Sequence, residues 1–213
     1  MVGLESSAVA RRIFLNNMKF MLGTKGKMTQ VFDDKGVVSP ATMIVAGPLV
    51  ATQVKTEDTD GYATVQFGFG AKKESRVNKA QTGKPFRYFR EFAAEGVESG
   101  ASVDVSTFAP GDLVSVSAIS KGKGFQGVVK RHGFHGGPRS HGQKNKERAP
   151  GSIGGGARAG GHVAKNMRMA GRMGGDRVTV KNLRVLQIDV ATNTLLLSGA
   201  VPGRPGTLVE IRG

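Results

Sequence analysis

Short runs in which apolar and polar residues alternate cover much of this chain, and turn residues separate them. Residues 28–32 and 37–45 flank Asp33–Gly36, a turn signal, and so predict a β-hairpin. Pro40 has no N–H to donate to a neighbouring strand, which predicts an edge or bulged position for the second strand. Gly47–Pro48 closes the hairpin.

Three further strands are predicted before residue 121. Residues 49–55 form the first of them, and residues 56–61 follow as a polar turn. Residues 62–69 and 113–120 alternate with a period of two, which is typical of half-buried strands.

The last part of the chain also has β character. Residues 177–190 predict a long strand, and residues 195–201 and 208–211 predict a final hairpin and an edge strand. Many short strands with little helix predict a closed or nearly closed barrel, because closure removes exposed sheet edges. The predicted fold is therefore mainly β, with a β-barrel domain formed by residues 21–120 and 177–213.

Residues 85–95 depart from the strand pattern. Their aromatic residues recur near the helical period of 3.6, and Pro85 fits a first helical turn, so one short helix is predicted here. Arg87 and Arg90 lie among these aromatics. Packing of the aromatic rings on the sheet and stacking of RNA bases on them both fit this composition.

Residues 121–176, called the extension below, have a different composition. They contain 12 Lys or Arg, two acids, 16 Gly and all four His of the chain. Their few large apolar side chains cannot offset the conformational entropy lost on ordering so many residues. We therefore expect a long, irregular Gly/Arg/Lys-rich extension, inserted between barrel strands and ordered by a polyanionic partner.

The charge of the chain is localised. The extension carries +10 (12 minus 2), and the other 157 residues carry +5 (19 minus 14), for a total of +15. Such a distribution favours contact with a nucleic acid or an anionic membrane. Sixteen glycines oppose the amphipathic helix that membrane binding requires, and no apolar run is long enough to span a membrane. We expect no membrane partner.

Nucleotide binding is a weak alternative. Gly122–Gly127 matches the G-x-G-x-x-G pattern after a predicted strand, with Glu147 20 residues beyond it. A dinucleotide site requires a helix to begin there, and only residues 128–132 are available before Gly133. Because no alternating strand and helix units surround the pattern, we expect no cofactor and no small-molecule substrate.

Metal binding and catalysis are not indicated either. The four histidines lie among cations and have no thiolate partners, so phosphate or base contacts suit them better than a dication. Neither Ser140 nor Ser152 has the sequence context of a nucleophile elbow. The chain also has no cysteine, which excludes disulfides and thiolate metal sites. We predict that the protein is not an enzyme.

Glycines interleaved with Arg and Lys suit a phosphate-binding segment. Glycines let the backbone approach a crowded surface and present N–H groups to phosphates, while the cations neutralise charge. The least bulky parts are Gly151–Gly161 and Gly171–Gly175. A disordered basic linker is the alternative, but the extension is not of low complexity and strands are predicted on both sides of it.

Several ordered motifs resemble the universal ribosomal large-subunit protein three, in its bacterial or organellar form. The likeness covers about residues 21–213. It lies in residues 22–32, 122–131, 140–142, 149–154, 168–174 and 201–203.

The resemblance implies a barrel on the subunit surface, with the extension reaching through rRNA toward the peptidyl transferase centre. It also implies a role in early subunit assembly near the 3′ end of the large rRNA. Residues 152–157 would form the inward tip, and residues 121–131 and 168–172 the two limbs. Expected partners are large-subunit rRNA and neighbouring large-subunit proteins, in cytoplasmic or organellar ribosomes.

The residues predicted to contact rRNA are mostly cations of the extension. They are Lys121, Lys123, Phe125, Lys130, Arg131, His132, Arg139, His141, Lys144, Arg148, Ser152, Ile153, Arg158, Lys165, Arg168 and Arg172.

The chain departs from the family pattern in two places. Many bacterial relatives carry a methylated glutamine at the tip, whereas residues 152–176 contain no Gln, so modification is not expected there. Residues 154–163 are also about one residue longer than usual. Residues 1–20 have no counterpart in the family, and we interpret them as a variable N-terminal extension, although a targeting segment or a misplaced start also fits. A free RNA chaperone or nucleoid-type binder is the alternative function.

Overall fold

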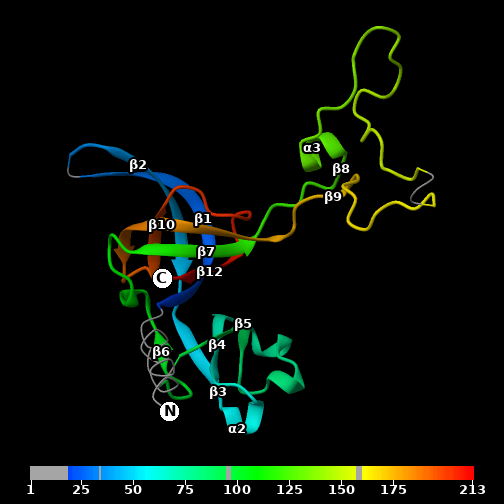
Figure 1. Cartoon of the computed structure of the whole chain (residues 1–213). Coiled ribbons are helices and arrows are strands. Elements are labelled where there is room, and N and C mark those ends of the chain that lie inside the picture. Colours follow the sequence, from blue (N-terminus) through cyan, green and yellow to red (C-terminus); the bar gives the residue numbers. More distant parts are fainter. Residues whose placement is uncertain (1–18, 34, 95–96, 157–159) are drawn as a thin grey trace, which may run out of the picture. The chain divides into compact units, whose positions relative to one another are not determined.

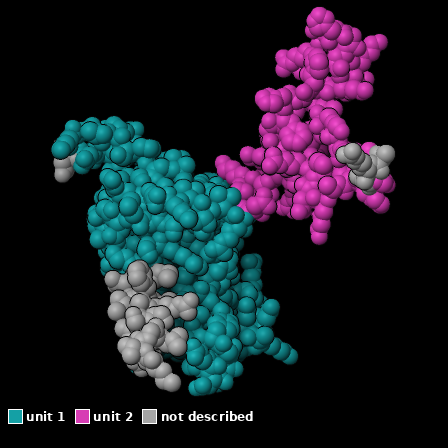
Figure 2. Space-filling view, viewed as in Figure 1, with its two compact units in different colours: residues 1–119, 177–213 teal, residues 120–176 magenta. Residues whose placement is uncertain are grey.

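The computed structural model describes residues 19–33, 35–94, 97–156 and 160–213. The chain divides into two compact units (Figure 2). Unit 1 joins the residues up to Ile119 with Arg177–Gly213, and unit 2 is Ser120–Asp176. Of the predicted N-terminal extension, residues 1–18 lie outside the described residues, and the first strand begins at Phe20.

A closed antiparallel barrel of six strands forms the larger part of unit 1 (Figure 1). Neighbouring strands around the ring are β1 (Phe20–Phe32), β12 (Leu208–Arg212), β7 (Leu113–Ile119), β10 (Arg177–Asp189), β11 (Thr194–Ser198) and β2 (Val38–Ala46). The prediction of a mainly β fold with a closed barrel is confirmed. Because β7 pairs directly with β10, from Ile119 opposite Arg177 onward, the two ends of the extension start from adjacent strands.

Alternation along the strands builds the barrel interior. In β7 the side chains of Val114, Val116 and Ala118 are buried, and the residues between them are more exposed. Strand β12 pairs with β1 on one side and with β7 on the other, so the prediction of an edge strand at residues 208–211 is wrong. Closure of the ring leaves β12 no free edge.

Strands β1 and β2 continue as a two-stranded ribbon past the barrel ladder. Their pairing runs to Phe32 opposite Val38, whereas β11 pairs with β2 only as far as Ala41. Pro40 lies just beyond that β11 ladder, so its missing N–H removes no barrel hydrogen bond. Pro40 thus occupies an edge position of β2, one of the two predicted alternatives, and the register shift of this pair lies in β1, between Lys25 and Met28.

A second sheet of four strands completes unit 1. Its order is β5 (Phe86–Phe92), β4 (Thr64–Ala71), β3 (Leu49–Lys55) and β6 (Ser102–Val103). The short elements α2 (Glu57–Asp60), η1 (Glu74–Arg76), η2 (Lys79–Gln81) and η3 (Val105–Thr107) join these strands to one another and to the barrel. Phe20 of β1 packs on Phe67 and Phe92, with ring centroids 4.8 and 4.3 Å away, so the sheet and the barrel share one core.

The helix predicted over residues 85–95 is wrong, since residues 86–92 form strand β5. Tyr88 and Phe92 lie opposite Phe69 and Val65 of β4 and face the core. Two residues four positions apart share a face in a strand as well as in a helix, so the spacing fits both. Residues 86–92 form a strand because they pair with β4. The predicted end at Glu95 lies outside the described residues. The described helices are instead α2, in the predicted polar turn, and α3 (Val128–His132) in unit 2.

Unit 2 is largely irregular. It contains α3 and a two-residue pairing of β8 (Phe125–Gln126) with β9 (Gly171–Arg172). Val128 is the one buried side chain among its described residues. The prediction of an irregular Gly/Arg/Lys-rich extension is therefore confirmed.

Candidate nucleic-acid interface

Backbone hydrogen bonds join the two limbs of the extension near its root. Ser120 N donates to Asp176 O over 2.9 Å, and Lys123 N donates to Met173 O over 2.9 Å. Met173 N donates back to Gly124 O over 2.9 Å, next to the β8–β9 pairing. Gly174 permits this approach, because a Cβ there would lie 2.2 Å from the Lys121 carbonyl oxygen. The main chain thus orders the root with little help from side chains.

A second connection between the limbs uses two of the predicted contact residues. Arg131 Nη1 donates to the Met169 carbonyl oxygen over 2.7 Å, and His132 Nε2 lies 3.0 Å from the same oxygen. Both side chains come from α3, which ends at Gly133 with a left-handed φ of 73°. Gly171 leaves room for the Arg131 guanidinium, since a Cβ there would lie 2.8 Å from Nη1. Arg131 and His132 therefore hold the two limbs together.

The loop after α3 is closed by contacts to Glu147. Gly137 N donates to the Glu147 carbonyl oxygen over 2.8 Å, and Arg139 Nε lies 2.7 Å from the Glu147 carboxylate. A Cβ at Gly136 would lie 2.0 Å from the same carbonyl oxygen, so only glycine fits this turn. The Arg139 side chain remains 85% exposed, so its outer N–H groups stay free for an anion.

This loop borders an open hollow of about 600 Å³. Cationic or ring-bearing side chains lie along its wall, including His132, His135, Lys146 and Arg168. Lys146 was not among the predicted contact residues. The only sequence signal for it was its place in the basic run from Lys144 to Arg148.

Residues 151–163 contain the predicted tip. Ser152 is exposed and Ile153 is half-buried, and Gly154 pairs with Val163 in an isolated bridge. The left-handed φ values of Gly154 and Gly155, 81° and 89°, suit glycine alone. Arg158 lies outside the described residues.

Most of the predicted contact residues are exposed. These are Lys121, Lys123, Phe125, Lys130, Arg139, His141, Lys144, Arg148, Lys165, Arg168 and Arg172. Phe125 is 77% exposed and lies opposite Arg172 in the β8–β9 pairing, which places a flat apolar ring beside a cation. Arg139 to Glu147 is the one ion pair within the described part of the extension. Its other described cations have no carboxylate to neutralise them, so a polyanion is the fitting ligand.

Three other kinds of site were considered from the sequence: a dinucleotide site, a metal site and a membrane-spanning segment. The helix that follows Gly122–Gly127 is five residues long, and β8 and β9 on either side of it pair antiparallel, unlike the parallel strands of a dinucleotide-binding unit. No three His, Asp or Glu side chains among the described residues are grouped as metal ligands. No helix in the described part is long and apolar enough to cross a membrane.

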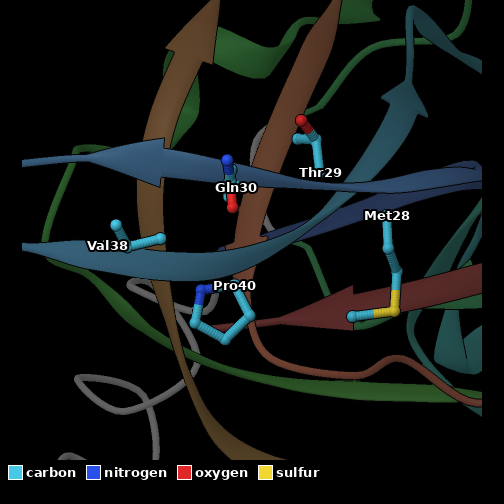
Figure 3. A pocket seen from close by; sticks show the side chains of 5 residues that line it. All are labelled: Met28, Thr29, Gln30, Val38 and Pro40. Carbon is cyan, nitrogen blue, oxygen red and sulfur yellow. The ribbon is translucent and has the colours of Figure 1, made fainter.

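A hollow of about 470 Å³ on the β1–β2 ribbon is a different kind of surface (Figure 3). Met28, Thr29, Gln30, Val38 and Pro40 line it, and none of them is charged. It carries no positive charge, so we do not include it in the candidate interface.

Known proteins resemble both units. A family model described as Ribosomal protein L3 matches residues 71–201. "Large ribosomal subunit protein uL3" of Acidothermus cellulolyticus is 52% identical over 206 residues, which cover 92% of each chain. The protein of that name from Herpetosiphon aurantiacus is 48% identical over 200 residues, or 90% of this chain and 94% of the relative. That of Pelotomaculum thermopropionicum is 46% identical over 204 residues, or 91% and 96%.

Proposed function

Because the chain belongs to the ribosomal protein L3 family, we propose that it is a structural, rRNA-binding constituent of the large ribosomal subunit. The observation that carries this proposal is the extension, with its net charge of +10 (12 minus 2) and its exposed, largely unpaired cations. The protein acts by holding RNA in place and performs no catalysis.

Binding through the extension follows from elementary electrostatics. Each Lys or Arg that meets a phosphate releases condensed counterions, which supplies most of the free energy of association. Gly122 and Gly127 have open space where a side chain would stand, so the backbone there can come close to a phosphate. RNA then supplies the contacts that a hydrophobic core supplies in the barrel.

The proposed rRNA contacts divide by role. The exposed cations Lys121, Lys123, Lys130, Arg139, Lys144, Arg148, Lys165, Arg168 and Arg172 meet phosphates, and we add Lys146 to them. Phe125 provides a ring for base stacking. Arg131 and His132 position the limbs, His141 contacts RNA from the loop after α3, and Ser152, Ile153 and Arg158 make the contacts near the tip.

The finer parts of the proposal rest on the family resemblance. The tip near Ser152 extends toward the peptidyl transferase centre, and the protein supports early assembly of the subunit. Its further partners are neighbouring large-subunit proteins, and it works in the ribosomes of the cytoplasm.

The salt dependence of binding tests the proposal. If six or more cations meet phosphates, the affinity of the full chain for a fragment of large-subunit rRNA should fall roughly a thousandfold or more between 50 and 200 mM salt. Filter binding or fluorescence anisotropy measures this directly. A nearly flat response to salt contradicts the proposal.

Co-sedimentation separates the ribosomal function from a free RNA chaperone. The tagged chain should pellet with large subunits in a cell extract and stay there through a sucrose gradient. Recovery in the light fractions, together with salt-dependent binding to RNA of any source, would instead support the chaperone.

A further inference from the structure

The positive charge outside the extension is also confined to one segment. Residues 72–90 contain seven Lys or Arg and one acid, Glu74, for a net +6. The chain total of +15 is therefore +10 from the extension, +6 from this segment and −1 from all other residues together. Outside residues 72–90, unit 1 therefore has a net charge of only −1.

This segment is the connection from β4 to β5 and most of β5 (Figure 1). Lys72 N donates to the Pro85 carbonyl oxygen over 2.9 Å, which closes the connection at its base. The one-turn helices η1 and η2 lie within it, and Lys84 Nζ donates to Gln53 Oε1 of β3 over 2.7 Å. These hydrogen bonds close the connection and attach it to β3.

Four cations of the segment point to an external ligand. Lys73, Arg76, Lys79 and Arg87, named the β4–β5 basic patch here, are exposed and form no ion pair with any described residue. Other cations of the segment have partners inside unit 1. Lys72 Nζ donates to Gln81 Oε1 over 3.1 Å, and Arg90 binds the Glu210 carboxylate.

The surroundings favour a phosphate backbone over a protein partner. Protein interfaces have apolar, charge-depleted centres. Between residues 64 and 112, the described chain exposes no large apolar side chain, whereas Ser75, Asn78 and Thr82 are exposed beside the cations. Hydroxyl and amide groups next to Arg and Lys are typical of contacts to phosphates.

We propose that the β4–β5 basic patch is a second RNA-backbone surface, on unit 1 and separate from the extension. The inference rests on the proposed function, because the ligand is the phosphate backbone of large-subunit rRNA. It adds a contact that the glycine-rich motifs of the extension do not encode.

A charge-matched set of variants tests this proposal in the full chain. Lys73→Ala/Arg76→Ala/Lys79→Ala removes three patch cations, and Lys181→Ala/Arg184→Ala/Arg204→Ala removes three exposed cations elsewhere in unit 1. With a large-subunit rRNA fragment, the slope of log affinity against log salt should fall in magnitude by about 2 to 3 for the patch variant. The control should change the slope by less than about 1.

Three results would overturn the inference. The first is an equal loss of slope in both variants, which would make net charge the cause. The second is no loss in either variant. The third is a patch variant that binds RNA normally but fails to join large subunits, which would assign the patch to an acidic protein.

Two controls keep these outcomes distinct. If the triple variant does not fold by circular dichroism, the single change Arg76→Gln should still reduce the slope by about 1. A wild-type chain with no salt-dependent binding would count against the proposed function instead, since the patch proposal predicts only a difference between variants.

Discussion

Among single residues, Glu210 joins the two sheets of unit 1 by ion pairs. Its side chain is 8% exposed and lies 2.6 Å from Arg90 Nε and 2.5 Å from Arg177 Nη2. Arg90 belongs to β5 of the second sheet, and Arg177 begins β10 of the barrel. Two charge-assisted hydrogen bonds offset the cost of burying this carboxylate.

We therefore expect Glu210→Gln to lower the free energy of unfolding. Glutamine keeps the shape but loses the charge, and both arginines are about half exposed, so the loss should be about 1 to 3 kcal/mol. Denaturant unfolding measures it, with Glu98→Gln as the matched control, because Glu98 is exposed and forms no ion pair with a described residue. Equal stability of the two variants would contradict this role.

At the scale of elements, the starts of β1 and β7 are fastened together. Lys19, directly before β1, lies 2.5 Å from the Asp112 carboxylate, which directly precedes β7. Gly213 N, at the end of β12, donates to the Lys19 carbonyl oxygen over 2.8 Å. The hydrogen bond from Lys19, followed by the one from Ala109 N, lowers the pKa of Asp112 below its ordinary value.

This pKa shift predicts a pH dependence of stability. Because the pKa of Asp112 is lower in the folded chain than in the unfolded chain, its contribution is present above the ordinary value of 3.8 and is lost as the pH falls through the folded pKa. Wild type should therefore have a higher thermal midpoint than Asp112→Asn near pH 6, and the difference should shrink as the pH falls below 3.8.

Thermal unfolding of both proteins across this pH range checks the expectation. Asp104→Asn is the control, since no hydrogen bond or ion pair of the Asp104 carboxylate to a described residue is present. A wild-type to Asp112→Asn difference that stays constant as the pH falls from 6 to well below 3.8 would show that the carboxylate charge does not matter.

At the scale of the whole molecule, the two units are stabilised in different ways. Unit 1 has a continuous core of buried apolar residues from the barrel and the second sheet. Unit 2 has one buried side chain in its described part and is ordered mainly through its backbone. The barrel should therefore fold without unit 2, whereas unit 2 needs its ligand.

Replacing residues 121–176 with Asn-Gly tests this division. Since Ile119 and Arg177 already pair, the residues Ser120-Asn-Gly form a three-residue hairpin loop between β7 and β10. The shortened chain should keep a β-type circular dichroism spectrum and a cooperative thermal transition. Its affinity for the rRNA fragment at 100 mM salt should fall by about a hundredfold or more, because six or more phosphate contacts are lost.

An unfolded remainder would contradict the independence of the barrel. Full RNA affinity in the shortened chain would instead contradict the role of the extension.

The sequence by itself determined the class of fold and the basic extension, because alternation, charge and glycine content are local properties. Its motifs also identified the family, which the comparisons confirm. Tertiary structure decided what depends on distant partners. Residues 86–92 form a strand because they pair with β4, and β12 has two neighbours because the ring closes. The side chains of Arg131 and His132 contact the Met169 carbonyl oxygen. Glu210 lies 120 residues from Arg90, so only folding brings their charges together.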